Sequence, residues 1–197
     1  MNVAMGWKAH SGWAALVALG EAESGPQVID RRRVELVEEE WAKQPYHAAE
    51  RLAPEDARKM VARGIEAARR IAVREMRAVV QREAGRGHTI AACAVLVGSP
   101  MPDWSTDQIL AVHFRMHKAE GVLFRDALAR AAQACGLQTL TIPEKQLLQT
   151  AGAALSMSPA SLSSKLTALG ASIGPPWAKD QKDAALAAFM ALHDRHI

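Results

Sequence analysis

Residues 89–97 read TIAACAVLV, a run of nine residues without a charge. The run has no polar alternation, so it predicts a central strand that is covered on both faces. Pro100 and Pro102 follow it and break the chain. A second short run, LQTLTI at residues 137–142, comes after a long helical stretch. Two such strands joined by a helix indicate an α/β fold with parallel neighbours.

The first forty residues predict strands of another kind. Residues 13–19 are apolar and short, and residues 21–26 form a turn signal that contains Gly25 and Pro26. Residues 28–37 alternate in part, which indicates a half-exposed strand. Residues 46–49 predict a third short strand or a loop.

Helices are predicted over most of the remaining chain. One extends from Pro54 to about Gly85, and a long one from Ser105 or Thr106 to about Cys135. Three more are expected at residues 143–155, 158–169 and 180–193. We therefore expect N-terminal antiparallel strands, then alternating helices and strands, in a mixed sheet with helices packed on it. Residues 1–197 should form a single domain.

Composition excludes several classes of protein. With 49% hydrophobic and 23% charged residues among 197, the chain is not intrinsically disordered. No apolar run has the roughly 20 residues that a membrane span needs, and the start lacks the pattern of a signal peptide. Two cysteines are too few for a disulfide scaffold. We expect a cytoplasmic protein.

Positive charge is concentrated in one helix. Ten basic and five acidic residues lie between Arg51 and Arg86, whereas the rest of the chain has a net charge of −2. At helical spacing one face carries Lys59, Arg63, Arg70, Arg74 and Arg77. This face is either solvated, with Glu66 pairing to Arg63 and Arg70, or a surface for nucleic-acid phosphates.

Four segments together resemble the RuvC-type Holliday-junction resolvases of the ribonuclease H-like superfamily. They are MGWKAHSGWAALVAL (5–19), EGVLFRDALARAAQACGLQTLTIPEK (120–145), SPASLSSKLTALG (158–170) and DQKDAALAAFMALH (180–193). The resemblance implies a ribonuclease H-like fold, a homodimer and branched DNA as partner. It also implies phosphodiester hydrolysis with two Mg²⁺ ions held by carboxylates.

Two of the carboxylates of that chemistry are present. Asp180 and Asp183 match the acidic pair of the last helix, so the resemblance implies that they are catalytic and bind Mg²⁺. Their spacing alone equally fits ordinary acidic residues at a helix N-terminus. We expect the last helix to bring both to the mouth of the sheet, beside the opening turn near Lys8.

The other two carboxylates are missing. Gly6 is followed by Trp7 and Lys8 where the family has an aspartate, and TIAACAVLV lacks the family's glutamate. A lysine at a Mg²⁺ position would repel the cation, although Lys8 could contact a phosphate instead. The sequence therefore predicts either a metal-dependent endonuclease with an incomplete site or a catalytically degenerate module that binds nucleic acid or acts as a scaffold.

One further cluster is predicted in the long helix from residue 105 to 135. His113, His117 and Glu120 share its apolar face. They form either an internal polar network or a catalytic or metal-binding group. Glu120 or His113 could assist Asp180 and Asp183, or the three could form the centre of a metal-dependent hydrolase of small substrates. His47 is a candidate third imidazole, although a surface or loop position is also open to it.

Overall fold

The computed structural model describes residues 1–23 and 25–194, and its five strands form one mixed sheet in the order β3-β2-β1-β4-β5. Strands β1 (Asn2–His10), β2 (Trp13–Ala22) and β3 (Gly25–Glu35) form an antiparallel meander. Strands β4 (Thr89–Val97) and β5 (Gln138–Pro143) continue it parallel to β1. The predicted α/β mixed sheet is confirmed, and TIAACAVLV is an internal strand.

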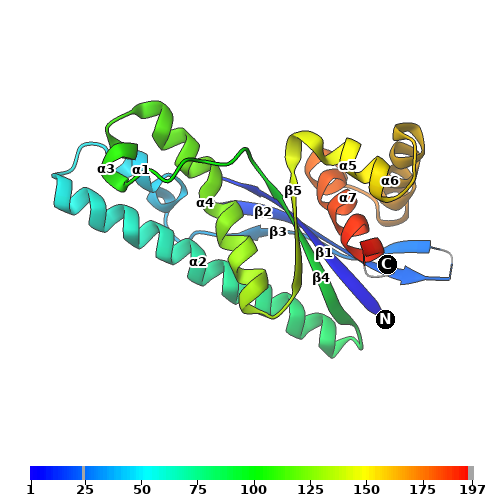
Figure 1. The fold of residues 1–197 in the computed structure, drawn as a ribbon. Helices are drawn as coiled ribbons and strands as arrows, with labels where there is room; N and C mark the ends of the chain where they lie inside the picture. The colour runs from blue at the N-terminus through cyan, green and yellow to red at the C-terminus, as the bar shows by residue number, and fades with distance from the viewer. Residues whose placement is uncertain (24, 195–197) are drawn as a thin grey trace.

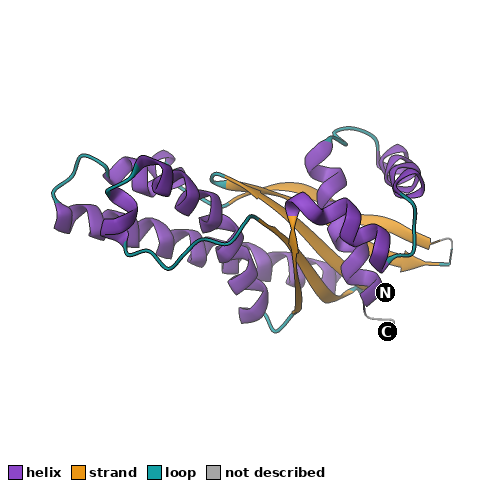
Figure 2. Ribbon diagram, turned by 45° about the horizontal axis from the view of Figure 1, so that its top comes forward, coloured by secondary structure: helices purple, strands orange, loops and turns teal. Residues whose placement is uncertain are grey.

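Helices cover both faces of the sheet, as Figures 1 and 2 show. Helices α2 (Pro54–Gly85) and α4 (His113–Ala134) pack on one face. Helix α7 (Lys179–His193) packs on the other, against β1, β2 and β4, and is flanked by α5 (Leu147–Ala154) and α6 (Pro159–Ile173). The short elements are η1 (Glu40–Lys43), α1 (Pro45–Ala49), α3 (Thr106–Leu110) and η2 (Glu144–Gln146).

Strand β1 separates two hydrophobic cores. Because side chains alternate across a strand, Met5 and Trp7 belong to the core beneath α2 and α4, whereas Ala4 belongs to the core beneath α7. Gly6 and Lys8 share the face of Ala4. This alternation decides which helix the side chain of Lys8 meets.

Two predicted elements were wrong. Residues 45–49 form helix α1 rather than a strand or loop, because Pro45 starts the helix and Tyr46 and Ala49 are buried. The predicted helix from residue 105 to 135 is broken into α3 and α4. Val112 between them is extended, with φ −141° and ψ 113°, which suits a β-branched residue of low helix propensity.

The length of the helices has one further consequence. No helix among residues 1–23 and 25–194 is both long and apolar enough to cross a lipid bilayer.

Candidate functional site

The side chain of Lys8 reaches the start of α7 because Gly6 allows that helix to approach β1. A Cβ atom built on Gly6 would lie 1.9 Å from the carbonyl oxygen of Ala184 and 2.7 Å from the backbone nitrogen of Ala188. The backbone of α7 therefore rests directly on β1 at this residue. Lys8, two residues further on, faces the first turn of α7.

The two aspartates of α7 meet Lys8 there, which confirms the placement expected from the sequence. The Lys8 Nζ atom lies 2.6 Å from Asp183 Oδ2 and 3.2 Å from Asp180 Oδ1. His10 approaches the same Asp180 oxygen, with its Nε2 atom at 3.2 Å. Strand β1 thus presents two nitrogen-bearing side chains to the acidic end of α7.

A third carboxylate, Glu144, completes the group, and sequence reasoning missed it. It stands directly after β5, and its Oε1 atom is 3.2 Å from Lys8 Nζ. Its other oxygen accepts a hydrogen bond of 2.9 Å from Arg125 of α4. A signal was present, since β4 and β5 are parallel and the carboxyl end of a parallel strand commonly carries site residues. We call Lys8, Asp180, Asp183 and Glu144 the Lys8 cluster.

The ammonium group of Lys8 is almost completely enclosed by these carboxylates. Its side chain is 5% exposed, and those of the three acids are 17–28% exposed. Burial alone would lower the pKa of Lys8, but hydrogen bonds to Asp183 and Glu144 outweigh it and raise that pKa above 10.5. Burial raises the pKa of Asp180, yet Lys8 and His10 hold it below 3.8. Lys8 and Asp180 are therefore charged at neutral pH.

The charges of the Lys8 cluster balance without a metal ion. Its three carboxylates are matched by the ammonium of Lys8, by Arg125 on Glu144 and by Lys179, which forms an ion pair with Asp183. The Mg²⁺ site that the sequence resemblance implies needs free anionic oxygens, and here both oxygens of Glu144, one of Asp180 and one of Asp183 already contact basic side chains. A further divalent cation would also stand beside the buried ammonium. These residues do not fit a Mg²⁺ site.

A groove borders the Lys8 cluster at the carboxyl ends of β4 and β5. Its volume is about 670 Å³, and Glu144, Arg125 and Lys179 line it together with Lys145. Open α/β sheets bind their ligands at this edge. Arg125 and Lys179 already pair with Glu144 and Asp183, so the excess positive charge of the groove is that of Lys145.

The predicted basic face of α2 exists, but much of its charge is paired. A single carboxylate, that of Glu38, contacts both Arg70 (3.2 Å) and Arg74 (2.7 Å), and the two arginines together hold the pKa of Glu38 below its usual value. Lys59 pairs with Glu55. The guanidinium of Arg63 lies 5.3 Å above the ring of Trp41.

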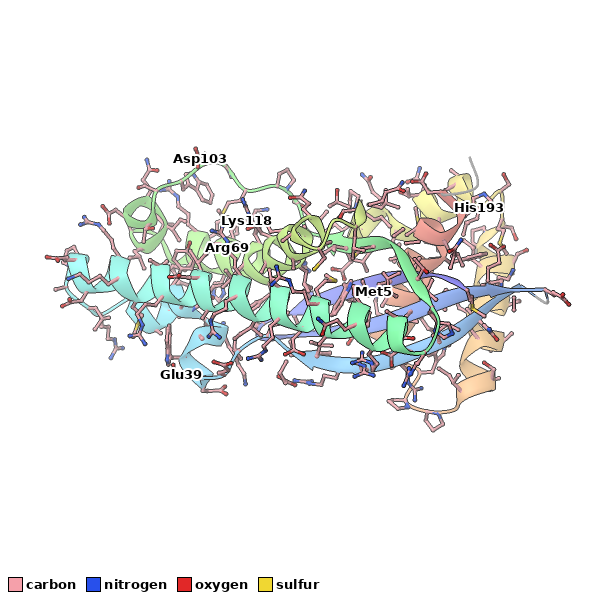
Figure 3. The ribbon with its side chains drawn as sticks, turned by 90° about the horizontal axis from the view of Figure 1, so that it is seen from below. Met5, Glu39, Arg69, Asp103, Lys118 and His193 are labelled. Carbon is pink, nitrogen blue, oxygen red and sulfur yellow. The ribbon has the colours of Figure 1, made fainter. Side chains whose placement is uncertain are left out.

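Four arginines nevertheless line one shallow hollow along α2. They are Arg69, Arg70, Arg74 and Arg77. Figure 3 shows α2 running along this side of the molecule, with Arg69 at its border with α4 and Glu39 beyond the opposite border. Lys8, the remaining residue predicted to bind nucleic acid, is buried on the other face of the sheet and has no comparable access to solvent.

The structure places Glu120 and His113 apart from the Lys8 cluster. Both carboxylate oxygens of Glu120 contact His47, one through the ring and one through the backbone N–H. His113 is 64% exposed, and His117 is exposed too. The expected position of His113 and His117 on the buried face was wrong, because the first turns of α4 extend beyond the sheet and lie beside α1 (Figure 1).

The strand order, with three antiparallel strands followed by two parallel ones and helices on both faces, defines a ribonuclease H-like fold. Two solved structures share it across nearly the whole chain. The Thermus thermophilus RuvC structure is 12% identical with a TM-score of 0.54, covering 98% of this chain and 95% of that one. The T. thermophilus RuvC in complex with Holliday junction substrate is 13% identical with a TM-score of 0.53, covering 100% and 96%. No protein-family model and no curated protein matches the sequence.

Proposed function

We propose that this protein binds nucleic acid through a RuvC-like fold and does not hydrolyse phosphodiesters at the Lys8 cluster. The observation that carries the proposal is the ammonium of Lys8, which lies 2.6–3.2 Å from Asp180, Asp183 and Glu144. Of the two nucleic-acid functions expected from the sequence, this favours the degenerate binding module over the Mg²⁺-dependent endonuclease.

Two properties of the Lys8 cluster argue against hydrolysis there. Two-metal hydrolysis requires carboxylates that clamp two divalent ions, and the carboxylates of the Lys8 cluster are already matched by an equal number of basic side chains in contact with them. Displacing Lys8 from the carboxylates would leave a buried ammonium group without its partners, which costs several kcal/mol. In this proposal the Lys8 cluster is structural, because it joins β1, the end of β5 and the start of α7.

Nucleic-acid binding is supported by the arginine-lined hollow of α2. Clustered arginines neutralise backbone phosphates, and their binding releases counterions. Glu38 neutralises part of this surface in the free protein. These ion pairs are more than half exposed, so they cost little to break when a phosphate replaces the carboxylate.

Fluorescence anisotropy with labelled DNA tests the binding. A four-way junction and a duplex of the same length are titrated at several salt concentrations, with the double variant Arg70→Glu/Arg74→Glu. The matched control is Lys165→Glu/Lys182→Glu, which makes the same charge change on α6 and α7, on the other face of the sheet. We expect the α2 variant to lose affinity and to lower the salt slope by about 2, and the control to bind as the wild type does. Equal losses in both variants would reject α2 as the binding surface.

The same junction tests the absence of cleavage. We expect no cut strand with Mg²⁺ or Mn²⁺ in the wild type or in Asp180→Asn and Asp183→Asn. Metal-dependent cleavage that both substitutions abolish would instead establish the endonuclease, with Asp180 and Asp183 as metal ligands. The homodimer implied by the sequence resemblance stays a prediction, and sedimentation of the protein with and without the junction measures it.

A further inference from the structure

Three histidines outside the Lys8 cluster come together from two helices. His47 belongs to α1, and His113 and His117 lie four residues apart in the first turns of α4. Their ring centroids are 4.6–5.0 Å apart, and one ligand atom from each lies within 4.8 Å of the others. Among the residues that the structure describes, no other group of three or more His, Cys, Asp or Glu side chains has ligand atoms close enough together to hold one metal ion.

Glu120 fixes the orientation of His47. Its Oε2 atom is 2.7 Å from His47 Nδ1, and its Oε1 atom accepts the His47 backbone N–H at 3.1 Å. Because an ionised carboxylate only accepts, Nδ1 is the donor to Glu120, and in the neutral ring Nε2 then keeps a lone pair. That Nε2 atom is shielded from solvent and has no hydrogen-bond partner among the described residues. A carboxylate behind a histidine whose other nitrogen is free is the usual arrangement around a bound metal.

The spacing of the other two histidines fits the same interpretation. The Nε2 atoms of His113 and His117 are 3.1 Å apart. A tetrahedral ion with Zn–N bonds of about 2.0–2.1 Å separates its ligand nitrogens by roughly 3.3 Å. The Nδ1 atom of His113 lies 3.9 Å from Glu50, a second carboxylate behind the cluster. The Nε2 atoms of His113 and His117 are therefore already close to the separation that a shared ion requires.

We propose that His47, His113 and His117 bind a Zn²⁺ ion, with Glu120 holding His47 in its ligating orientation. Imidazole ligands suit zinc and exclude Mg²⁺, which prefers oxygen. Three protein ligands leave the fourth position to water, as in catalytic rather than structural zinc sites. That position faces solvent, because His113 and His117 are exposed. The site is independent of the nucleic-acid surface proposed for α2.

Zinc titration of untagged, chelator-treated protein against a chromophoric zinc indicator tests the site. We expect one tightly bound equivalent in the wild type and none in His113→Ala or His117→Ala. Both replaced side chains are exposed, so the variants should fold, which circular dichroism checks. The matched control is His88→Ala, which removes a histidine paired with the buried Glu83 at 3.0 Å outside the cluster and should keep the equivalent.

The Glu120→Gln variant distinguishes zinc ligated by the three histidines from zinc adsorbed nonspecifically on the protein surface. It keeps the size of the side chain but weakens the support of His47, so zinc affinity should fall about 10–100-fold. Co²⁺ should give the visible absorption of a tetrahedral site in the wild type and lose it in His117→Ala. The proposal is overturned if the wild type binds no stoichiometric zinc, or if the His113→Ala/His117→Ala double variant binds it as tightly as His88→Ala does.

Discussion

Replacing Lys8 by methionine should destabilise the protein far more than the loss of a surface lysine. Methionine keeps most of the side-chain volume but removes the ammonium group. Asp180, Asp183 and Glu144 would then face one another with Arg125, Lys179 and His10 as their remaining partners, each of which contacts one of the three acids. The free energy of unfolding should therefore fall, because a charged group inside the protein loses its partner.

The expected size of this loss comes from the burial of Lys8. Breaking a buried ion pair from one side costs about 3–5 kcal/mol. Because the three carboxylates are 17–28% exposed, water offsets part of this, and we expect about 3 kcal/mol. For a chain of 197 residues such a loss lowers Tm by roughly 6–12 °C. Urea unfolding at pH 7, followed by circular dichroism, measures it.

The control is Lys179→Met. It removes an ammonium from the same Asp183, but one on a side chain that is 76% exposed, so it should cost less than about 1 kcal/mol. The penalty of Lys8→Met should also shrink between pH 7 and pH 4, as the unopposed carboxylates take up protons. If Lys8→Met costs no more than Lys179→Met, the Lys8 ammonium does not hold the three carboxylates of the cluster together.

Three further predictions concern pH, packing and charge. In the wild type the stabilisation from Lys8 is complete below its unfolded pKa of 10.5 and is lost as pH rises further. The stabilisation from Asp180 is complete above its unfolded pKa of 3.8 and is lost as pH falls further. Urea midpoints measured from pH 3 to pH 11 should show both losses. Gly6→Ala should lower the free energy of unfolding by about 3 kcal/mol or more, since its Cβ would clash with Ala184. The control Gly121→Ala, in open space on α4, should stabilise the protein slightly. Equal unfolding free energies for the two variants would contradict the close packing of α7 on β1. Glu38→Gln should tighten junction binding by freeing Arg70 and leaving Arg74 paired with Glu75 alone, and weaker binding would show that Glu38 does not screen these arginines.

The sequence predicted the order of strands and helices from residue 13 onwards apart from α1 and the break before α4, because apolar runs, prolines and glycines mark most of their boundaries; no apolar run marked β1, whose polar residues include Lys8 and His10. The family resemblance also placed the aspartates of the last helix beside Lys8, and the structure gives the physical reason, since Gly6 and Lys8 share one face of β1. Glu144 was missed because its partner Lys8 is 136 positions away in the chain and no local pattern connects them. The sequence resemblance predicted Asp180 and Asp183, but it did not predict the basic side chains that neutralise them.

Long-range pairing also explains the errors at the charged surfaces. Helical spacing suggested that Glu66 pairs with Arg63 and Arg70, but the segment before η1 returns alongside α2 and brings Glu38 to Arg70. Likewise, a surface or loop position was considered for His47, whereas α1 presses it against Glu120. Spacing along one helix does not reveal which side chains a distant segment brings to it.

The ammonium group of Lys8 fills the space between Asp180, Asp183 and Glu144, so we expect these carboxylates to hold no divalent ion. Diffraction from crystals soaked in Mn²⁺, recorded for its anomalous signal, tests this most directly. We predict no anomalous peak between Asp180, Asp183 and Glu144, with Lys8 Nζ at 2.6–3.2 Å from their oxygens. A manganese peak there, with Lys8 turned away, would contradict the claim.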